Sequence, residues 1–202
     1  MSIKLTYFDI HGGRGEPARI ALRMAGVPFE DERVPFAQWR SLKPTFPFQS
    51  MPVLEVDGRR ITQSNTINRY VGKLTDLYPS DPWQAALCDE VMDAVEDIGQ
   101  RVSATFTMTE SEKKNVREML ASGPIPMFLR GLEGLIGARG GTFFADDRLT
   151  VADLKALVWI GHLLSGKLDH IPAHVVAENA PRLVSYYETI CDHPKVKPYF
   201  RG

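Results

Sequence analysis

The stretch SMPVLEVDGRRITQSNTINRY, residues 50–70, decides the fold of this chain. It predicts a strand after Pro52, a turn at Asp57-Gly58, a second short strand, and a helix that Ser64 caps. Aspartate followed by glycine between two apolar runs is typical of a two-residue hairpin turn. The proline directly before the first strand is the unusual feature, because it brings no N–H to a sheet.

Strand-like and helix-like patterns alternate over the first 78 residues. Pro17 stands near the start of the first predicted helix and Gly26 at its end, where these residue types are common. The predicted order is β-α-β-α-β-β-α. The elements cover residues 3–8, 16–26, 29–34, 37–43, 51–56, 59–63 and 64–74.

Downstream of Pro82 the patterns are helical only. The helical segments cover residues 83–110, 112–136, 150–165 and 181–192. Between the two halves, the stretch LYPSDPW has two prolines and little apolar content, as linkers do. The sequence therefore predicts a thioredoxin-like α/β domain over residues 1–78, a linker over 79–84, and an all-α domain over 85–202.

Pro52 has two interpretations. In the first, the proline begins a strand or lies on an edge strand. In the second, the Met51-Pro52 bond is cis, as in thioredoxin-type folds with this order of elements, and the N–H and C=O of Met51 stay free to pair with an extended peptide. The residue by itself leaves both open.

Two places near this strand are suited to a carboxylate. Ser64 and the free N–H groups at the start of its helix form the first, with Gln63 beside them. Trp39 and Lys43, four residues apart, supply an indole N–H and an ammonium group for the second. Two such sites around a strand-pairing site fit a short peptide with a carboxylate at each end, and glutathione is such a peptide.

The overall charge is balanced, at −1 for 202 residues. This excludes a general attraction for nucleic acid or an anionic membrane. Neither a membrane helix nor a signal peptide is predicted, so we expect a cytoplasmic protein. Cys88 and Cys191 are expected to be packing residues, and the spacing of the histidines predicts no metal site.

The stretch LTVADLKAL predicts the start of a helix. Thr150 is placed to cap it, and Asp153 to return a hydrogen bond to the backbone of Thr150. Leu149 and Leu154 bracket this capping box as a hydrophobic staple. We therefore interpret Asp153 as a structural residue and not as a catalytic one.

Five separated motifs together resemble the cytosolic glutathione transferases, nearest to the sigma-like, tyrosine-using group. They are KLTYFDI with RGEPARIAL, WRSLKPTFPFQSMPVLEVDG, TQSNTINRYVGKL, the long acidic helix, and LTVADL. They occur in the order and at the spacing of that family and span essentially the whole chain. The resemblance implies an N-terminal glutathione-binding domain, a helical domain that helps to bind a second substrate, and a homodimer.

The resemblance gives Tyr7 the role of the catalytic hydroxyl and Arg14 that of a nearby cation. A thiol with a pKa of about 8.5 is only slightly ionised at neutral pH, and a hydroxyl that donates to the sulfur anion lowers that pKa. Outside the family context, a packing aromatic is the favoured interpretation of Tyr7. The loop from His11 to Arg14 carries an extra glycine and a histidine in place of the family's arginine, so it is expected to be longer.

The resemblance also implies a set of residues that bind glutathione. Asp97 belongs to the acidic face of the long helix, which is otherwise interpretable as a solvated surface, and it is expected to act from the partner subunit. Ser50 replaces the longer residue of many relatives. The set comprises Trp39, Lys43, Ser50, Met51, Pro52, Gln63, Ser64 and the Asp97 of the partner subunit.

For the second substrate the resemblance implies a hydrophobic electrophile, which the thiolate attacks. Its pocket is expected to contain Phe8, Gly13, Val102, Phe106 and Phe200, although each of these alone is more typical of a core than of a pocket. The predicted function is a detoxifying glutathione transferase. The alternatives are a glutathione-dependent isomerase, which Ala104 disfavours because prostaglandin-isomerising relatives carry an aromatic there, and a non-catalytic, crystallin-like binding protein.

Overall fold

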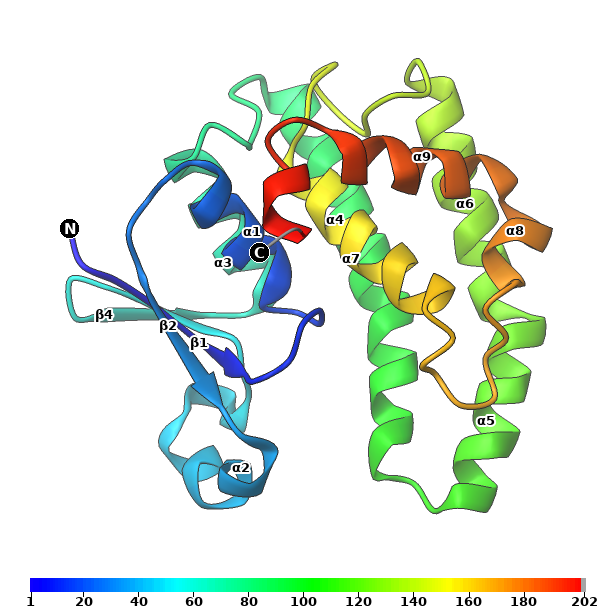
Figure 1. Cartoon of the computed structure of the whole chain (residues 1–202), viewed down its shortest axis with the longest axis horizontal. Coiled ribbons are helices and arrows are strands. Elements are labelled where there is room, and N and C mark those ends of the chain that lie inside the picture. Colours follow the sequence, from blue (N-terminus) through cyan, green and yellow to red (C-terminus); the bar gives the residue numbers. More distant parts are fainter. Residues whose placement is uncertain (201–202) are drawn as a thin grey trace.

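The computed structural model describes residues 1–200, which form an α/β domain and a helical domain side by side (Figure 1). The four-stranded sheet has the order β2-β1-β3-β4. Strand β1 pairs in parallel with β2 and antiparallel with β3, which continues into β4. The strands are β1 (Ile3–Phe8), β2 (Glu30–Val34), β3 (Val53–Val56) and β4 (Arg59–Thr62).

The predicted order β-α-β-α-β-β-α is confirmed. Figure 1 shows α1 and α3 together on the side of the sheet that faces the helical domain, with α2 beyond the opposite side. Two short 3-10 turns, η1 (Lys43–Thr45) and η2 (Pro47–Gln49), continue the chain after α2. The helices are α1 (Glu16–Met24), α2 (Phe36–Leu42) and α3 (Ser64–Leu74).

The hairpin is as predicted, and the structure decides between the two interpretations of Pro52. Asp57 and Gly58 both have positive φ, at 47° and 77°, which is the backbone of a type I′ turn. The Met51-Pro52 peptide bond is cis. Within residues 1–200, no backbone hydrogen bond outside the helices and strands involves Met51.

The predicted role of Ser64 as an N-cap is wrong. Gln63 occupies the cap position with a φ of 70°, and no side chain caps α3. Ser64 is the first residue of the helix, and its hydroxyl is bonded to a carboxylate of the other domain. The Ser64 hydroxyl therefore makes a contact between the domains instead of the helix-capping hydrogen bond that its residue type and position predict.

The helical domain differs from the prediction at three places. Helix α4 ends at Ala104 instead of residue 110, because a 3-10 turn, η3 (Thr105–Thr107), and the cap Thr109 interrupt it. The segment 112–136 contains two helices, separated at Gly123 by a proline that begins the second. Helix α8 is an additional element. The helices are α4 (Pro82–Ala104), α5 (Glu110–Ser122), α6 (Pro124–Ala138), α7 (Val151–Leu164), α8 (Val175–Asn179) and α9 (Pro181–Asp192).

Helix α7 is the central helix of this domain, and its capping box is formed as predicted. One carboxylate oxygen of Asp153 accepts the N–H and the hydroxyl of Thr150, both at 2.8 Å. The other accepts the Phe144 N–H at 3.0 Å and the Tyr186 hydroxyl at 2.8 Å. Asp153 is fully buried, so these four donors compensate for its lost hydration. Its structural role is confirmed.

Contacts between the domains fix their relative position. Helix α7 packs on α1 and α3, and the final turn η4 (Lys197–Phe200) packs on α1. The Tyr199 hydroxyl donates to Glu16 Oε1 at 2.5 Å, which ties the end of the described chain to α1. The boundaries after residues 78 and 84 stay a prediction, and α4 already begins at Pro82. Within residues 1–200, no helix combines the length and apolar character needed to cross a bilayer.

Candidate active site

Tyr7 lies near the end of β1 and is 6% exposed. Its hydroxyl oxygen accepts the backbone N–H of Arg14 at 2.9 Å. Burial raises the pKa of Tyr7, and the bond from Arg14 opposes that rise without reversing it. The phenol is therefore protonated at neutral pH. Among the bonds described for residues 1–200, none uses its proton, so it remains a donor for a ligand.

The loop over residues 11–15, which we call the glycine loop, closes directly over the Tyr7 ring. Gly13 has a φ of 73°, and a Cβ there would lie 2.6 Å from the Tyr7 hydroxyl oxygen. A Cβ on Gly15 would lie 2.5 Å from Cγ of the same ring. Only glycine fits this approach without a shift of the ring. The predicted pocket residue Gly13 is thus next to the Tyr7 hydroxyl.

Aromatic side chains pack beside Tyr7 on the α2 side of the sheet. The Phe8 ring stacks on Phe36 at 4.7 Å between centroids and meets Trp39 edge-on at 5.3 Å. Trp39 also contacts Phe46, at 5.8 Å. Trp39 is therefore held by packing. Phe8, which the resemblance assigned to the hydrophobic pocket, belongs to this aromatic group.

The other predicted glutathione-binding residues of this domain differ in burial. Met51 is buried in a small core with Tyr7, and Pro52 is buried next to it. Lys43, Ser50 and Gln63 are exposed. The N-terminal domain thus supplies exposed polar groups around a buried phenol and the cis peptide.

A cluster of charged and polar side chains lies where the two domains meet. Glu96 of α4 is at its centre, with Arg14 Nε 2.6 Å from Oε1 and Lys155 Nζ 2.6 Å from Oε2. The Ser64 hydroxyl donates to Oε2 of Glu96 at 3.0 Å, and the Lys155 ammonium also donates to the side-chain oxygen of Asn65. We call these five residues the junction cluster. Arg14, predicted to face the sulfur, directs its guanidinium to Glu96 instead.

Two cations determine the charge state of Glu96. Burial by itself raises the pKa of this carboxyl, but Lys155 and Arg14 lower it to about 2. Burial lowers the pKa of Lys155, and the neighbouring Glu96 opposes that shift. The pair is therefore ionic at neutral pH, with Arg14 as a second positive charge.

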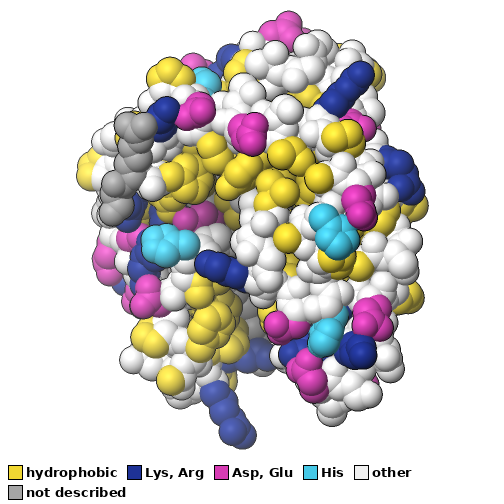
Figure 2. Space-filling view, turned by 45° about the vertical axis from the view of Figure 1, so that its right-hand side comes forward, with side chains coloured by type: hydrophobic (Ala, Val, Ile, Leu, Met, Phe, Trp, Pro, Cys, Tyr) yellow, Lys and Arg dark blue, Asp and Glu magenta, His cyan; other side chains and the backbone are white. Residues whose placement is uncertain are grey.

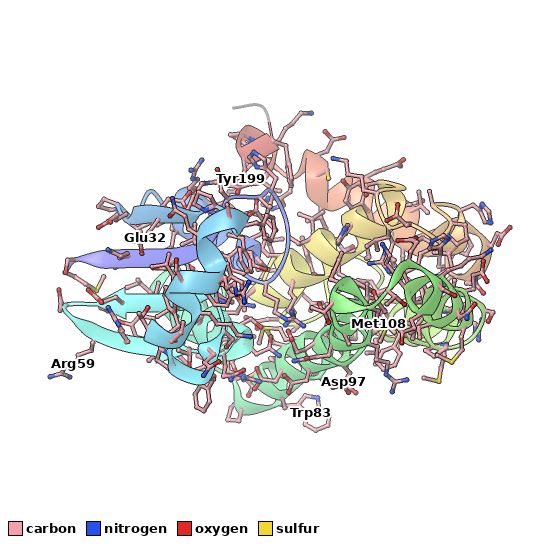
Figure 3. The ribbon with its side chains drawn as sticks, turned by 90° about the horizontal axis from the view of Figure 1, so that it is seen from below. Glu32, Arg59, Trp83, Asp97, Met108 and Tyr199 are labelled. Atoms are coloured by element: carbon pink, nitrogen blue, oxygen red, sulfur yellow. The ribbon has the colours of Figure 1, made fainter. Side chains whose placement is uncertain are left out.

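Part of the acidic face of α4 is paired with α3, while Asp93 and Asp97 remain exposed to solvent. Asp89 accepts Arg69 Nε at 2.8 Å, and Asp93 accepts the Asn65 side-chain N–H at 2.5 Å. Asp97, on the same helix, is exposed and projects outward (Figure 3).

The predicted residues for the second substrate are in different environments. Val102 is 2% exposed and belongs to the main core. Phe106 is 62% exposed on η3, with the Arg117 guanidinium 4.9 Å from its ring centroid. Phe200 is also exposed and lies edge-on to Tyr199. Figure 2 shows hydrophobic side chains gathered over the junction of the two domains, with charged and histidine side chains around them.

Sequence reasoning missed the roles of Glu96 and Lys155. In the sequence, Glu96 is one of several acidic residues of the long helix and has no feature of its own that distinguishes it. The sequence does contain a sign that Lys155 is buried, because this lysine lies within the mostly apolar helix segment VADLKALVWIGHLL. A lysine at a buried position of such a helix needs a partner, and the partners are on α3 and α4.

The family comparison agrees with this geometry. The N-terminal domain model of glutathione S-transferases matches residues 3–73, and the C-terminal domain model matches residues 96–201. Glutathione S-transferase 1 of Ascaris suum is 32% identical over 200 residues, which covers 97% of this chain and 94% of that protein. The chain belongs to the glutathione S-transferase family.

Solved structures extend the similarity to the whole fold. The prostaglandin synthase D of Nilaparvata lugens is 30% identical with a TM-score of 0.86, covering 100% of this chain and 98% of that one. A sigma class enzyme of Fasciola hepatica is 25% identical with a TM-score of 0.84, covering 99% and 95%. The predicted fold and the prediction of a sigma-like glutathione S-transferase are confirmed.

Proposed function

We propose that Tyr7 donates its hydroxyl proton in a hydrogen bond to the sulfur of glutathione and stabilises the thiolate. The observation that carries this is a buried, protonated phenol at the end of β1, held by the Arg14 N–H under two glycines. A hydrogen bond to a charged acceptor is stronger than a neutral one. Lowering a thiol pKa by about two units takes about 2.7 kcal/mol, which one such bond and a nearby cation supply together.

The reaction is the addition of this thiolate to a hydrophobic electrophile. The thiol proton leaves to water, and the sulfur lone pair forms a bond to the electrophilic carbon. In a substitution the leaving group departs with its bonding electrons, and in an addition the carbanion takes up a proton. The hydrophobic side chains over the domain junction support an apolar second substrate (Figure 2).

Glutathione is proposed to lie in extended form along the cis peptide. The Met51 backbone pairs with its cysteinyl unit, beside Pro52. Trp39 and Lys43 hold the glycyl carboxylate, with Ser50 nearby. Gln63, Ser64 and the start of α3 hold the carboxylate of the γ-glutamyl residue, and the absence of a side-chain cap on α3 supports this.

The test is retention on immobilised glutathione followed by turnover of a chloronitrobenzene, with Tyr7→Phe as the variant. We expect the variant to bind the column and to lose about 100- to 1000-fold in kcat, as when one donor to a developing anion is removed. The bound thiol should titrate below the free one in the wild type only. Equal turnover by wild type and variant would remove Tyr7 from the mechanism.

The second candidate is a glutathione-dependent isomerase. Its support is the similarity to the prostaglandin synthase D of Nilaparvata lugens. An isomerase returns glutathione unchanged, whereas a transferase consumes it, so product analysis with a labelled tripeptide separates the two. A non-catalytic, crystallin-like role is disfavoured by the presence of Tyr7 with its proton available.

We propose that the protein is a homodimer in which Asp97 reaches the ammonium group of glutathione bound by the partner. Phe48 is 78% exposed on a segment with positive φ, and Trp83 is 69% exposed in the first turn of α4, the helix that carries Asp97. Large exposed aromatics of this kind are typical of interfaces. Asp97→Ala should weaken glutathione binding about 3- to 10-fold without changing the thiol pKa, whereas Asp147→Ala should leave binding unchanged. A monomer in sedimentation experiments, or equal binding by Asp97→Ala, would overturn this assignment.

A role in detoxification within the cytoplasm completes the proposal. It rests on the family and on the expected range of hydrophobic electrophiles. Fractionation of the source cells, together with turnover of several unrelated electrophiles, tests it. Activity on one electrophile only would argue against a detoxifying role.

A further inference from the structure

Lys155 is a buried charged residue that connects the two domains. It lies on α7, in the helical domain, and its side chain is only 6% exposed. The ammonium group crosses the domain boundary to the start of α3, where it lies 3.5 Å from Ser64 Oγ. A buried lysine is costly unless every donor has a partner.

All three donors of this ammonium group are used. They go to Glu96 Oε2 at 2.6 Å, to the side-chain oxygen of Asn65, and to Ser64 Oγ. Because Ser64 accepts from Lys155, its own proton is directed to Glu96. Lys155 therefore determines both the charge that Ser64 faces and the direction of its hydroxyl.

The net charge of the junction cluster affects how a ligand carboxylate can bind at Ser64. Arg14 and Lys155 are positive and Glu96 is negative, so the cluster carries a net charge of +1. Without Lys155 the net charge is zero, and the Glu96 carboxylate lies 3.0 Å from the hydroxyl that a ligand carboxylate needs. Two carboxylates that share one donor at this distance repel each other.

We propose that Lys155 is a positioning residue of the glutathione site, whose ammonium group neutralises Glu96 so that Ser64 and the start of α3 can accept the carboxylate of the γ-glutamyl residue. This inference rests on the proposed function of the site. On binding, the Ser64 hydroxyl turns its proton from Glu96 to the ligand, and Lys155 and Arg14 keep Glu96 paired. The helical domain thus contributes to peptide binding within the same subunit.

The experiment compares two peptides by calorimetry. Glutathione carries the carboxylate in question, and 4-aminobutanoyl-cysteinyl-glycine is the same tripeptide without it. For Lys155→Met we expect Kd for glutathione to rise about 10- to 100-fold and Kd for the truncated peptide to stay within about twofold of wild type. Lys114→Met, on the exposed face of α5, is the matched control for the loss of one lysine, and it should bind both peptides as wild type does.

A double variant keeps the test decisive if Lys155→Met folds poorly. In Lys155→Met/Glu96→Gln the cluster again has a net charge of +1, from Arg14 alone, and we expect Kd for glutathione to return to within about threefold of wild type. A structural role does not predict this recovery. Unchanged binding by the single variant, equal losses for both peptides, or no recovery in the double variant would each overturn the role of Lys155. Failure of the wild type to bind glutathione would instead overturn the proposed function.

Discussion

The glycine loop over Tyr7 and the junction cluster serve one site but are built in different ways. The first uses residues that lie within eight positions of Tyr7, held by backbone geometry and ring packing. The second joins side chains up to 91 positions apart by charge. In the proposed function, the group that acts on the thiol is therefore positioned by local sequence, whereas the groups proposed to bind the peptide carboxylate are positioned by the docking of the two domains.

This difference predicts that the two regions respond differently to substitution. Changes over Tyr7 should act mainly on kcat, since the ring orientation is at stake. Changes in the junction cluster should act mainly on stability and on glutathione affinity. The predictions below begin with the change expected to cost the most free energy.

Glu96→Gln should lower the free energy of unfolding by about 2–4 kcal/mol at pH 7, because it leaves the buried Lys155 and the partly buried Arg14 without their carboxylate. The pKa of Glu96 is lowered from 4.5 to about 2, so its stabilisation is present above about pH 4.5 and is lost as the pH falls through 2. The difference in free energy of unfolding between variant and wild type should therefore become smaller as the pH falls from 4.5 to 2. Urea unfolding across this pH range measures the difference.

Glu90→Gln is the matched control for that experiment. Glu90 is on the same helix and pairs with Arg139, but its side chain is 51% exposed. An exposed pair of this kind contributes only about 0–1 kcal/mol. Equal losses for the two variants, or a Glu96→Gln loss that is undiminished at low pH, would contradict the assignment of Glu96 as the charged centre.

Gly15→Ala should destabilise the protein by about 1–3 kcal/mol, because the new Cβ meets the Tyr7 ring at 2.5 Å. The backbone φ at Gly15 is −84°, which alanine adopts freely, so the effect is steric. We expect kcat to fall at least about tenfold as the ring turns, with a smaller change in glutathione affinity. Steady-state kinetics and thermal unfolding provide both values.

Gly131→Ala is the contrast for this change. It lies within α6, and a Cβ there meets nothing within 4 Å. Alanine should therefore stabilise the helix by about 0.5–1 kcal/mol and leave kcat unaltered. If Gly15→Ala behaved in the same way, the close packing over Tyr7 would have no part in catalysis.

Trp39→Phe should have the smallest effect. The variant keeps an aromatic ring between Phe8 and Phe46 but loses the indole N–H proposed for the glycyl carboxylate. We expect glutathione to bind about 3- to 10-fold more weakly, with kcat at saturation unchanged. Calorimetry with glutathione and with its glycyl ester distinguishes the cause, since the ester should bind both proteins equally. An equal loss for the ester would point to packing.

Much of the N-terminal domain was predictable because its signals are local. Alternating patterns, the Asp57-Gly58 turn and the position of Pro52 each constrain neighbouring residues only, and the observed strands and helices follow them. The errors have the same origin. The helical pattern over residues 112–136 predicts one helix, but Gly123 and the proline after it divide it into two. The Ser64 hydroxyl, predicted to cap its helix, bonds to Glu96 of the other domain instead.

The sequence by itself determined the order of elements, the capping box at Thr150 and the family that these imply, because each depends on residue types at fixed short spacings, whereas the structure decided between the two interpretations of Pro52. Only the tertiary structure decided that Arg14 turns to Glu96, that part of the acidic face of α4 pairs with α3, and that Lys155 is buried beside Ser64. These ion pairs form only when whole helices pack against each other. Helix packing depends on how the helix surfaces fit together in three dimensions, and short sequence motifs do not contain that information.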